Sequence, residues 1–174
     1  IKENLMELKT LLSLSSTPKR IEVYDNSHTS GSFMLGAMVV AGQEGFIKSE
    51  YKKFNAKFEA TAKGDDYGML KETLKRRFLN EKMKNIKPDL IIIDGGKGQY
   101  SSALEVLKEL DIKTPFICMA KGRDRNSGKE WLFYEGKEFQ LPFTSPLLYY
   151  LQVLRDEAHR FAITSHRNRR DKNL

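Results

Sequence analysis

The sequence predicts an α/β fold in which a mixed β-sheet is flanked by helices. A short, wholly apolar run at 90–93 is typical of a strand buried on both faces of a sheet. Before this run, extended segments are joined by short turns that contain glycine, which predicts an antiparallel meander. After it, helical patterns separate apolar runs, as they do where helices pack on the faces of a sheet.

The composition fits one domain with a substantial core. At 174 residues the chain carries 30 Lys and Arg against 23 Asp and Glu, a net charge of +7 that suggests a polyanionic partner. Its single cysteine, Cys118, excludes an internal disulfide and fits a reducing cytoplasm. No apolar stretch approaches the ~20 residues needed to span a bilayer, and the start lacks a signal-peptide pattern. Because the chain opens on Ile1, we expect it to be a piece of a longer protein.

The first segment is predicted to be a short helix. Leucines recur at helical spacing over 3–14, and Ser15–Pro18 interrupt the pattern. We expect residues 1–17 to form a leading helix or linker, and residues 18–174 to form the domain.

Three strands of a meander are predicted next. Residues 20–26 alternate apolar and polar side chains, which brings Asp25 to the same side as the core residues. An acid placed there needs a partner or a metal, because burying a bare charge is very costly. Residues 32–42 and 46–55 are predicted to form the second and third strands.

A helix and a central strand follow the meander. Asp65 and Asp66 open a helix predicted to run to about Lys84, although the helix dipole alone favours acids in a first turn. A second helix is predicted over 99–110, and a further buried strand over 115–120. The first of these helices is expected to bury Met69, Leu70, Leu74 and Phe78 and to expose Lys71, Lys75, Arg76 and Arg77.

The last part of the chain is predicted to hold a loop, a hairpin and a helix. The charged loop 121–130 could contact a phosphate backbone or simply be mobile, and we favour mobility. A small hairpin is predicted over 131–141. Ser145 followed by Pro146 is a favourable helix start, and this helix is expected to end near Ser165 and be followed by a basic tail.

Asp94 stands at the end of the central strand and is followed by Gly95, Gly96 and Gly98. A carboxylate at the carboxyl end of a central strand, with glycines clearing space around it, is where α/β folds place their chemistry. In the alternative reading Asp94 only caps the next helix. A nucleotide phosphate loop is disfavoured, because GGKGQ lacks the spacing and the Ser or Thr of G-x-x-x-x-G-K-[ST].

The order of these elements is that of the ribonuclease H arrangement: a meander, then β-α-β-α-β, then a C-terminal helix. In this arrangement the first and fourth strands are neighbours, so Asp25 and Asp94 are expected to lie side by side. Two carboxylates that close repel each other unless a proton or a divalent cation lies between them. Mg²⁺ or Mn²⁺ is the natural occupant, and such ions activate water for phosphodiester cleavage. We therefore predict a metal-dependent nuclease.

Seven sequence blocks stand out along the chain: YDNSHTSG, IKSEYKKFN, GDDYGML, LIIIDGGKGQ, MAKG, LPFTSP and RDEAHRFAITSHRNRR. Together they resemble the C-terminal endonuclease half of the UvrC family, the incision subunit of bacterial nucleotide excision repair. The resemblance extends from about residue 11 to residue 172, with the blocks in the family's order. The first block departs from the family's usual Asp-Ile-Ser-His, because Asn26 replaces the Ile.

The resemblance implies a ribonuclease H-like endonuclease that makes the incision 5′ to a lesion. By position, it implies catalytic roles for Asp25, Asp66, Asp94 and His159, with Asp65 as an alternative to Asp66. Asp25, Asp94 and His159 would hold Mg²⁺ or Mn²⁺. His159 could ligate the ion, accept a proton from the attacking water, or be purely structural, as a lone His on a helix often is.

The same resemblance implies partners and a location. The family's N-terminal nuclease domain, its UvrB-binding segment and its helix-hairpin-helix module are expected to lie outside this chain. The implied partners are damaged double-stranded DNA and, in the full-length protein, the UvrB–DNA complex, in the bacterial cytoplasm without a membrane and with the fragment as a monomer. A nucleic-acid-binding scaffold without activity is the alternative function. From the excess positive charge we expect DNA contacts at Lys97, Lys121, Arg155, Arg160, Arg167, Arg169 and Arg170.

Overall fold

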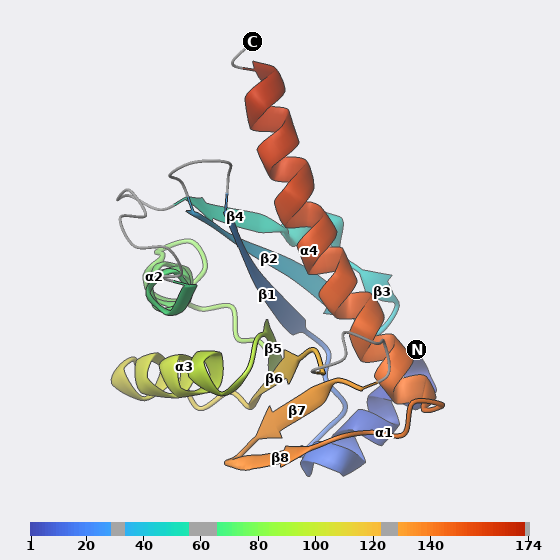
Figure 1. Cartoon of the computed structure of the whole chain (residues 1–174). Coiled ribbons are helices and arrows are strands. Elements are labelled where there is room, and N and C mark those ends of the chain that lie inside the picture. Colours follow the sequence, from blue (N-terminus) through green and yellow to red (C-terminus); the bar gives the residue numbers. More distant parts are fainter. Residues whose placement is uncertain (29–33, 56–65, 123–128, 173–174) are drawn as a thin grey trace.

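A computed structural model of the chain describes residues 1–28, 34–55, 66–122 and 129–172. In these residues eight strands form one mixed sheet in the order β3-β2-β1-β5-β6-β7-β8, and β4 also pairs with β2 (Figure 1). This confirms the mixed ribonuclease H-like sheet. The strands are β1 (Ile21–His28), β2 (Met34–Gly42), β3 (Gly45–Phe46), β4 (Lys52–Asn55), β5 (Leu90–Asp94), β6 (Phe116–Ala120), β7 (Trp131–Tyr134) and β8 (Lys137–Phe139).

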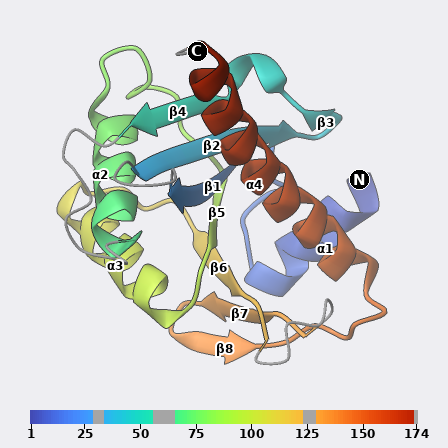
Figure 2. The same cartoon turned by 45° about the horizontal axis from the view of Figure 1, so that its top comes forward.

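Helices cover both faces of the sheet, with α1 and α4 on one face and α2 and α3 on the other (Figure 2). None of the helices in the described residues is long and apolar enough to span a membrane. The division of the chain at residue 17 stays a prediction. The helices are α1 (Lys2–Leu12), α2 (Asp66–Leu79), α3 (Lys97–Glu109) and α4 (Pro146–Lys172), and a 3₁₀ turn, η1, occupies Lys48–Glu50.

The sheet separates two hydrophobic cores, because successive side chains of a strand point to opposite faces. In β5, Leu90 and Ile92 pack on the α1–α4 side, while Ile91 and Ile93 pack on the α2–α3 side. All four side chains are buried. The apolar run at 90–93 therefore forms a central strand that is buried on both faces, as predicted.

The prediction of one continuous strand over 46–55 is wrong. The segment forms β3, η1 and β4, and the pairing with β2 shifts by three residues, since Ala41 pairs with Phe46 but Met38 pairs with Lys52. The extra residues are taken up in η1, where the Glu50 carboxylate accepts a hydrogen bond from Arg20 at 2.5 Å. Alternation of side chains alone does not reveal such an insertion.

The predicted exposure of Arg77 is also wrong, because its guanidinium is fully buried. It donates to both carboxylate oxygens of Glu22, with Nε at 3.0 Å and Nη2 at 2.6 Å. It also donates to the carbonyl oxygens of Met83 and Ile86, in the turns that follow α2. The helix α2 ends at Leu79 and not near residue 84 as predicted, and these two bonds to Arg77 hold the turns that follow it.

The predicted basic tail is part of α4, which continues to Lys172 and not only to about Ser165. Neither Gly nor Pro follows Pro146, so the sequence contains no residue that strongly disfavours a helix there. The Ser145 hydroxyl oxygen accepts the Leu148 N–H at 3.3 Å, which confirms the predicted cap. In Figure 1 the last turns of α4 extend beyond the sheet.

Candidate active site

Two acids lie next to each other at the carboxyl ends of the central strands. The parallel strands β1 and β5 pair in a register that joins Val23 to Ile92 and Tyr24 to Ile93. Asp25 and Asp94 come next along the two strands. Both follow the alternation that places Val23 and Ile92 on the α4 side, so they share that face.

Asp25 is buried, with only 3% of its surface exposed. Burial, the hydrogen bond with Asp94, and the charges of Asp94 and Asp66 raise the pKa of Asp25 to about 8, against a smaller opposing effect of Lys121. Its Oδ2 atom accepts no hydrogen bond from the described residues. The site therefore holds more negative charge than its own polar groups satisfy.

The third acid of the site opens a helix. Asp66 is the first residue of α2, and its backbone carbonyl accepts a hydrogen bond from Asn26 Nδ2 at 3.3 Å. Asn26 therefore joins β1 to the start of α2. The sequence showed that Asn26 replaces the Ile usual in the family, but it did not reveal this contact. Asp65, the alternative third acid, lies outside the described residues.

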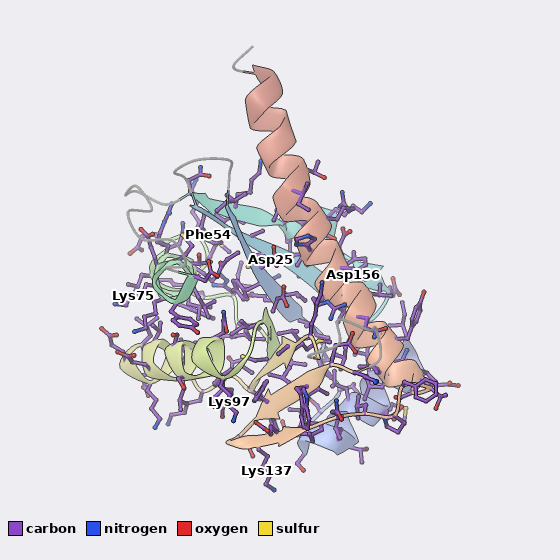
Figure 3. The ribbon with its side chains drawn as sticks, viewed as in Figure 1. Asp25, Phe54, Lys75, Lys97, Lys137 and Asp156 are labelled. Carbon is purple, nitrogen blue, oxygen red and sulfur yellow. The ribbon has the colours of Figure 1, made fainter. Side chains whose placement is uncertain are left out.

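His159 reaches the acids from α4. Its Nδ1 lies 3.5 Å from Asp25 Oδ2, and 58% of its side chain is exposed. The neighbouring Ala158 is buried and packs α4 against the sheet. Figure 3 shows Asp25 beside α4, on which Asp156 is also labelled. His159 thus lies beside Asp25, which neighbours Asp94, and the charge of Asp66 acts on Asp25 from α2.

The segment after β5 turns away sharply from Asp94. Gly95 has φ +151° and donates its N–H to the Met119 carbonyl at 2.7 Å. A Cβ at Gly95 would overlap the side chain of Gln99, which in turn accepts the Gly96 N–H at 2.9 Å. The N-cap of α3 is Gly96, so the reading of Asp94 as a cap is wrong.

The donor set suits a hard divalent cation. Within the described ranges, no group of three or more His, Cys, Asp or Glu side chains forms a metal-binding cluster. What the structure does contain is a carboxylate pair, the buried Asp25 Oδ2 without a hydrogen bond, and the His159 imidazole beside that oxygen. Carboxylate oxygens with one imidazole fit Mg²⁺ or Mn²⁺.

The basic residues expected to contact DNA differ in their surroundings. Lys121 is exposed and its charge acts on Asp25, so it lies near the acids. Lys97 and Arg160 are exposed and form ion pairs with Glu138 and Glu157, at 3.2 and 2.7 Å. The backbone of Arg167, Arg169 and Arg170 belongs to α4, but their side chains are not among those that the structure describes.

Arg155 differs from the other basic candidates because it is buried, with 7% of its surface exposed. Its guanidinium donates to the buried carboxylate of Glu130 at 3.4 Å and to Asp156 at 3.2 Å. Gln152 donates to the same Glu130 oxygen at 3.0 Å. This arrangement is evidence against a DNA contact through Arg155 and favours a structural role. No sequence signal links Glu130 to a residue 25 positions away.

The sheet order, the helices on its two faces and the paired acids at its carboxyl edge define a ribonuclease H-like nuclease domain. The model of the UvrC RNase H endonuclease domain family matches residues 9–163. The chain belongs to that family.

Curated relatives are similar along almost the whole chain. UvrABC system protein C of Wolbachia pipientis subsp. Culex pipiens is 57% identical over 98% of this chain. The protein of the same name from Sphingopyxis alaskensis is 51% identical over 95% of it. The chain spans only 28% and 27% of the length of these two relatives.

Solved structures are more distant. Endonuclease V from Bacillus subtilis covers 98% of this chain and 92% of its own, with a TM-score of 0.49 and 12% identity. Ciona intestinalis endonuclease V in complex with a 24mer DNA covers 70% and 59%, with a TM-score of 0.45 and 18% identity. The assignment to the family therefore rests on the sequence matches.

Proposed function

We propose that this chain is a metal-dependent DNA endonuclease domain that makes the 5′ incision beside lesions in nucleotide excision repair. The observation that carries the proposal is the buried Asp25, whose carboxylate lies against Asp94 at the carboxyl edge of the sheet. It would act as a monomeric part of a longer protein on the UvrB–DNA complex, in the bacterial cytoplasm.

The residues of the site divide the chemistry among themselves. Asp25 and Asp94, with His159 beside them, would hold Mg²⁺ or Mn²⁺, and Asp66 adds negative charge from α2. Such an ion activates a water molecule and offsets the charge that develops on the phosphodiester. Burial of Asp25 keeps bulk water from screening its charge. His159 is exposed enough to meet the attacking water, so it would serve either as a ligand or as the proton acceptor.

The substrate would lie across the carboxyl edge of the sheet. Its phosphates would be contacted by Lys121 near the acids, by Lys97 at the start of α3 and by Arg160 on α4. The basic end of α4, with Arg167, Arg169 and Arg170, would extend this contact. Arg155 is left out of this set because it is buried and paired.

The test is 5′ incision of a lesion-bearing duplex by the full-length protein together with the other UvrABC proteins. We expect incision with Mg²⁺ or Mn²⁺, none with EDTA, and none with the Asp25→Asn variant. Asp111→Asn is the matched control, because Asp111 is exposed at the far end of α3 with φ 56°, a conformation that Asn tolerates. Normal DNA binding without any incision by the unmodified protein would instead support the inactive scaffold.

A further inference from the structure

Two sequence blocks that resemble the family contact each other in the structure. Tyr67, in the block GDDYGML, is the second residue of α2, and Gly98, in LIIIDGGKGQ, is the second residue of α3. A Cβ built on Gly98 would overlap the ring and the hydroxyl of Tyr67. The aromatic ring therefore occupies the space that the missing side chain leaves.

The position of this contact is defined by the acids on either side of it. Tyr67 directly follows Asp66, and Gly98 lies four residues after Asp94. The first turns of α2 and α3 thus meet through Tyr67 beside the carboxyl edge of the sheet. Gly is a poor helix former, so its place in the first turn of α3 points to a requirement for space.

Tyr67 is not covered by this packing, since 48% of its surface remains exposed. A ring that served only to join two helices would gain most by burying both of its faces. Here the ring is held on one side by Gly98 and offers the remainder to solvent, in the helical turn that begins with Asp66. A planar aromatic surface of this kind is what proteins use to stack nucleotide bases.

We propose that Tyr67 stacks on a nucleotide of the cleaved strand close to the scissile phosphate, and that Gly98 provides the seat for its ring. This inference rests on the proposed nuclease function. Stacking on an aromatic ring tolerates any base, so Tyr67 would hold the strand in place without reading its sequence. Tyr67 is then a substrate-contacting residue, distinct from the acids that would bind metal.

The first experiment compares four variants of the full-length protein in incision and DNA-binding assays. Tyr67→Ala should weaken DNA binding or incision by about 5- to 100-fold, whereas Tyr67→Phe should stay within about twofold of the unmodified protein. Gly98→Ala should reproduce the Tyr67→Ala defect, because the added methyl group displaces the ring. The double variant should be no worse than Tyr67→Ala, since both changes remove the same interaction.

Tyr149→Ala is the matched control. Tyr149 is also an exposed aromatic on a helix, at 69%, but it lies in the first turns of α4, ten residues before His159. It should leave incision and binding unchanged. Thermal melting accompanies each variant, and Tyr67→Leu replaces Tyr67→Ala if the latter is unfolded, because Leu fills the seat without a ring.

The second experiment separates stacking from a purely structural role. Abasic residues are placed one at a time at each nucleotide around the incision. The loss of incision caused by Tyr67→Ala, relative to the unmodified protein, should vanish when the abasic residue stands at one position and persist when it stands at the others. If Tyr67→Ala reduces incision equally on every substrate, Tyr67 only positions Asp66. If it reduces incision on none of them, Tyr67 has no role. Either result overturns the proposal.

Failure of the proposed function would be visible separately. If the unmodified protein cuts none of the duplexes, the nuclease assignment fails, and fluorescence anisotropy on the same abasic series still decides whether Tyr67 stacks. Stacking is supported if the unmodified protein binds weakly to the duplex with one particular abasic position and normally to the others. It is overturned if the unmodified protein and Tyr67→Ala bind every duplex of the series with the same affinity.

Discussion

Asp25 carries an electrostatic cost that an ordinary core position would avoid. Its carboxylate is buried beside Asp94, and its pKa is raised to about 8. An apolar residue of similar size would fill the same space without desolvating a charge. Two acids kept at one buried edge are expected where a cation binds, since the cation offsets their repulsion.

Replacing Asp94 by Asn should abolish incision while preserving the fold. Asn keeps the size and one oxygen but loses the charge that would hold the ion, so activity should fall by several orders of magnitude. DNA affinity should remain within a few-fold, and the metal-free variant should melt at a higher temperature, because repulsion of Asp25 is removed. Incision assays and thermal melting check this, and near-normal 5′ incision by Asp94→Asn would contradict the mechanism.

The stability of the metal-free protein should fall as pH rises from about 4 to about 8. The pKa of Asp25 is raised in the folded state, from 3.8 to about 8, so the folded state binds this proton more tightly than the unfolded state does. Its stabilising contribution is full below pH 4 and is lost as pH approaches 8. Melting curves in EDTA across this range measure the effect.

The control for this pH dependence is Asp94→Asn. Because Asn removes the neighbouring negative charge that helps raise the pKa of Asp25, the difference in melting temperature between variant and unmodified protein should grow with pH. A difference that stayed constant from pH 5 to pH 8 would show that Asp25 does not titrate in that range.

At the scale of elements, α4 is held to the sheet one turn before His159. Arg155 and Glu130 form a buried pair that joins α4 to the residue preceding β7. The position of the His159 imidazole relative to Asp25 depends on how α4 lies against the sheet. The pair therefore acts on the site through the helix and not through contact with substrate.

Replacing Arg155 by Met should destabilise the chain by about 3–5 kcal/mol, because the change removes one partner of a buried ion pair. The double variant Arg155→Met with Glu130→Gln should recover much of this loss, since the buried negative charge of Glu130 is removed as well. Urea denaturation of the 174-residue chain measures both. Arg160→Met serves as the control, because its exposed pair with Glu157 should contribute about 0–1 kcal/mol.

Most elements were predictable because local patterns specify them. The buried run of β5, the leucine stripe of α1 and the Ser145 cap all follow from residues close together in sequence. The turns after α2 and the break at η1 were not, because their side-chain partners, Arg77 and Arg20, also bind carboxylates or carbonyls that no local pattern reveals. A pattern within one segment contains no information on such partners.

The site was predictable to a similar degree. Element order placed Asp25 and Asp94 side by side, whereas the roles assigned to Asp66 and His159 came from the family resemblance. Arg155 is an example of what was not predictable. Its positive charge suggested a contact with DNA, whereas the structure buries it beside an acid of the same chain. Whether an Arg faces solvent or a buried acid is decided by tertiary packing.

At the scale of the whole molecule, the net charge of +7 should make DNA binding strongly dependent on salt. Lys97→Gln and Lys121→Gln should each reduce the slope of log K against log salt by roughly 1, since each removes one phosphate contact. Lys108→Gln is the control, because Lys108 is exposed at the opposite end of the same helix as Lys97. Binding titrations at several salt concentrations test this, and equal slopes for all three variants would place the DNA elsewhere.

The contact between His159 and Asp25 joins residues 134 positions apart in the chain. Asp25 lies in β1 and His159 lies in α4, so strands β2 to β8 are synthesised between the two residues. A chain still being synthesised can pair β1 with β5 and assemble the two acids, but it has no imidazole beside them. Because contacts so distant in sequence form late in folding, the complete set of groups arises only in the finished domain. We therefore expect the proposed DNA cleavage to begin only after α4 has packed on the sheet.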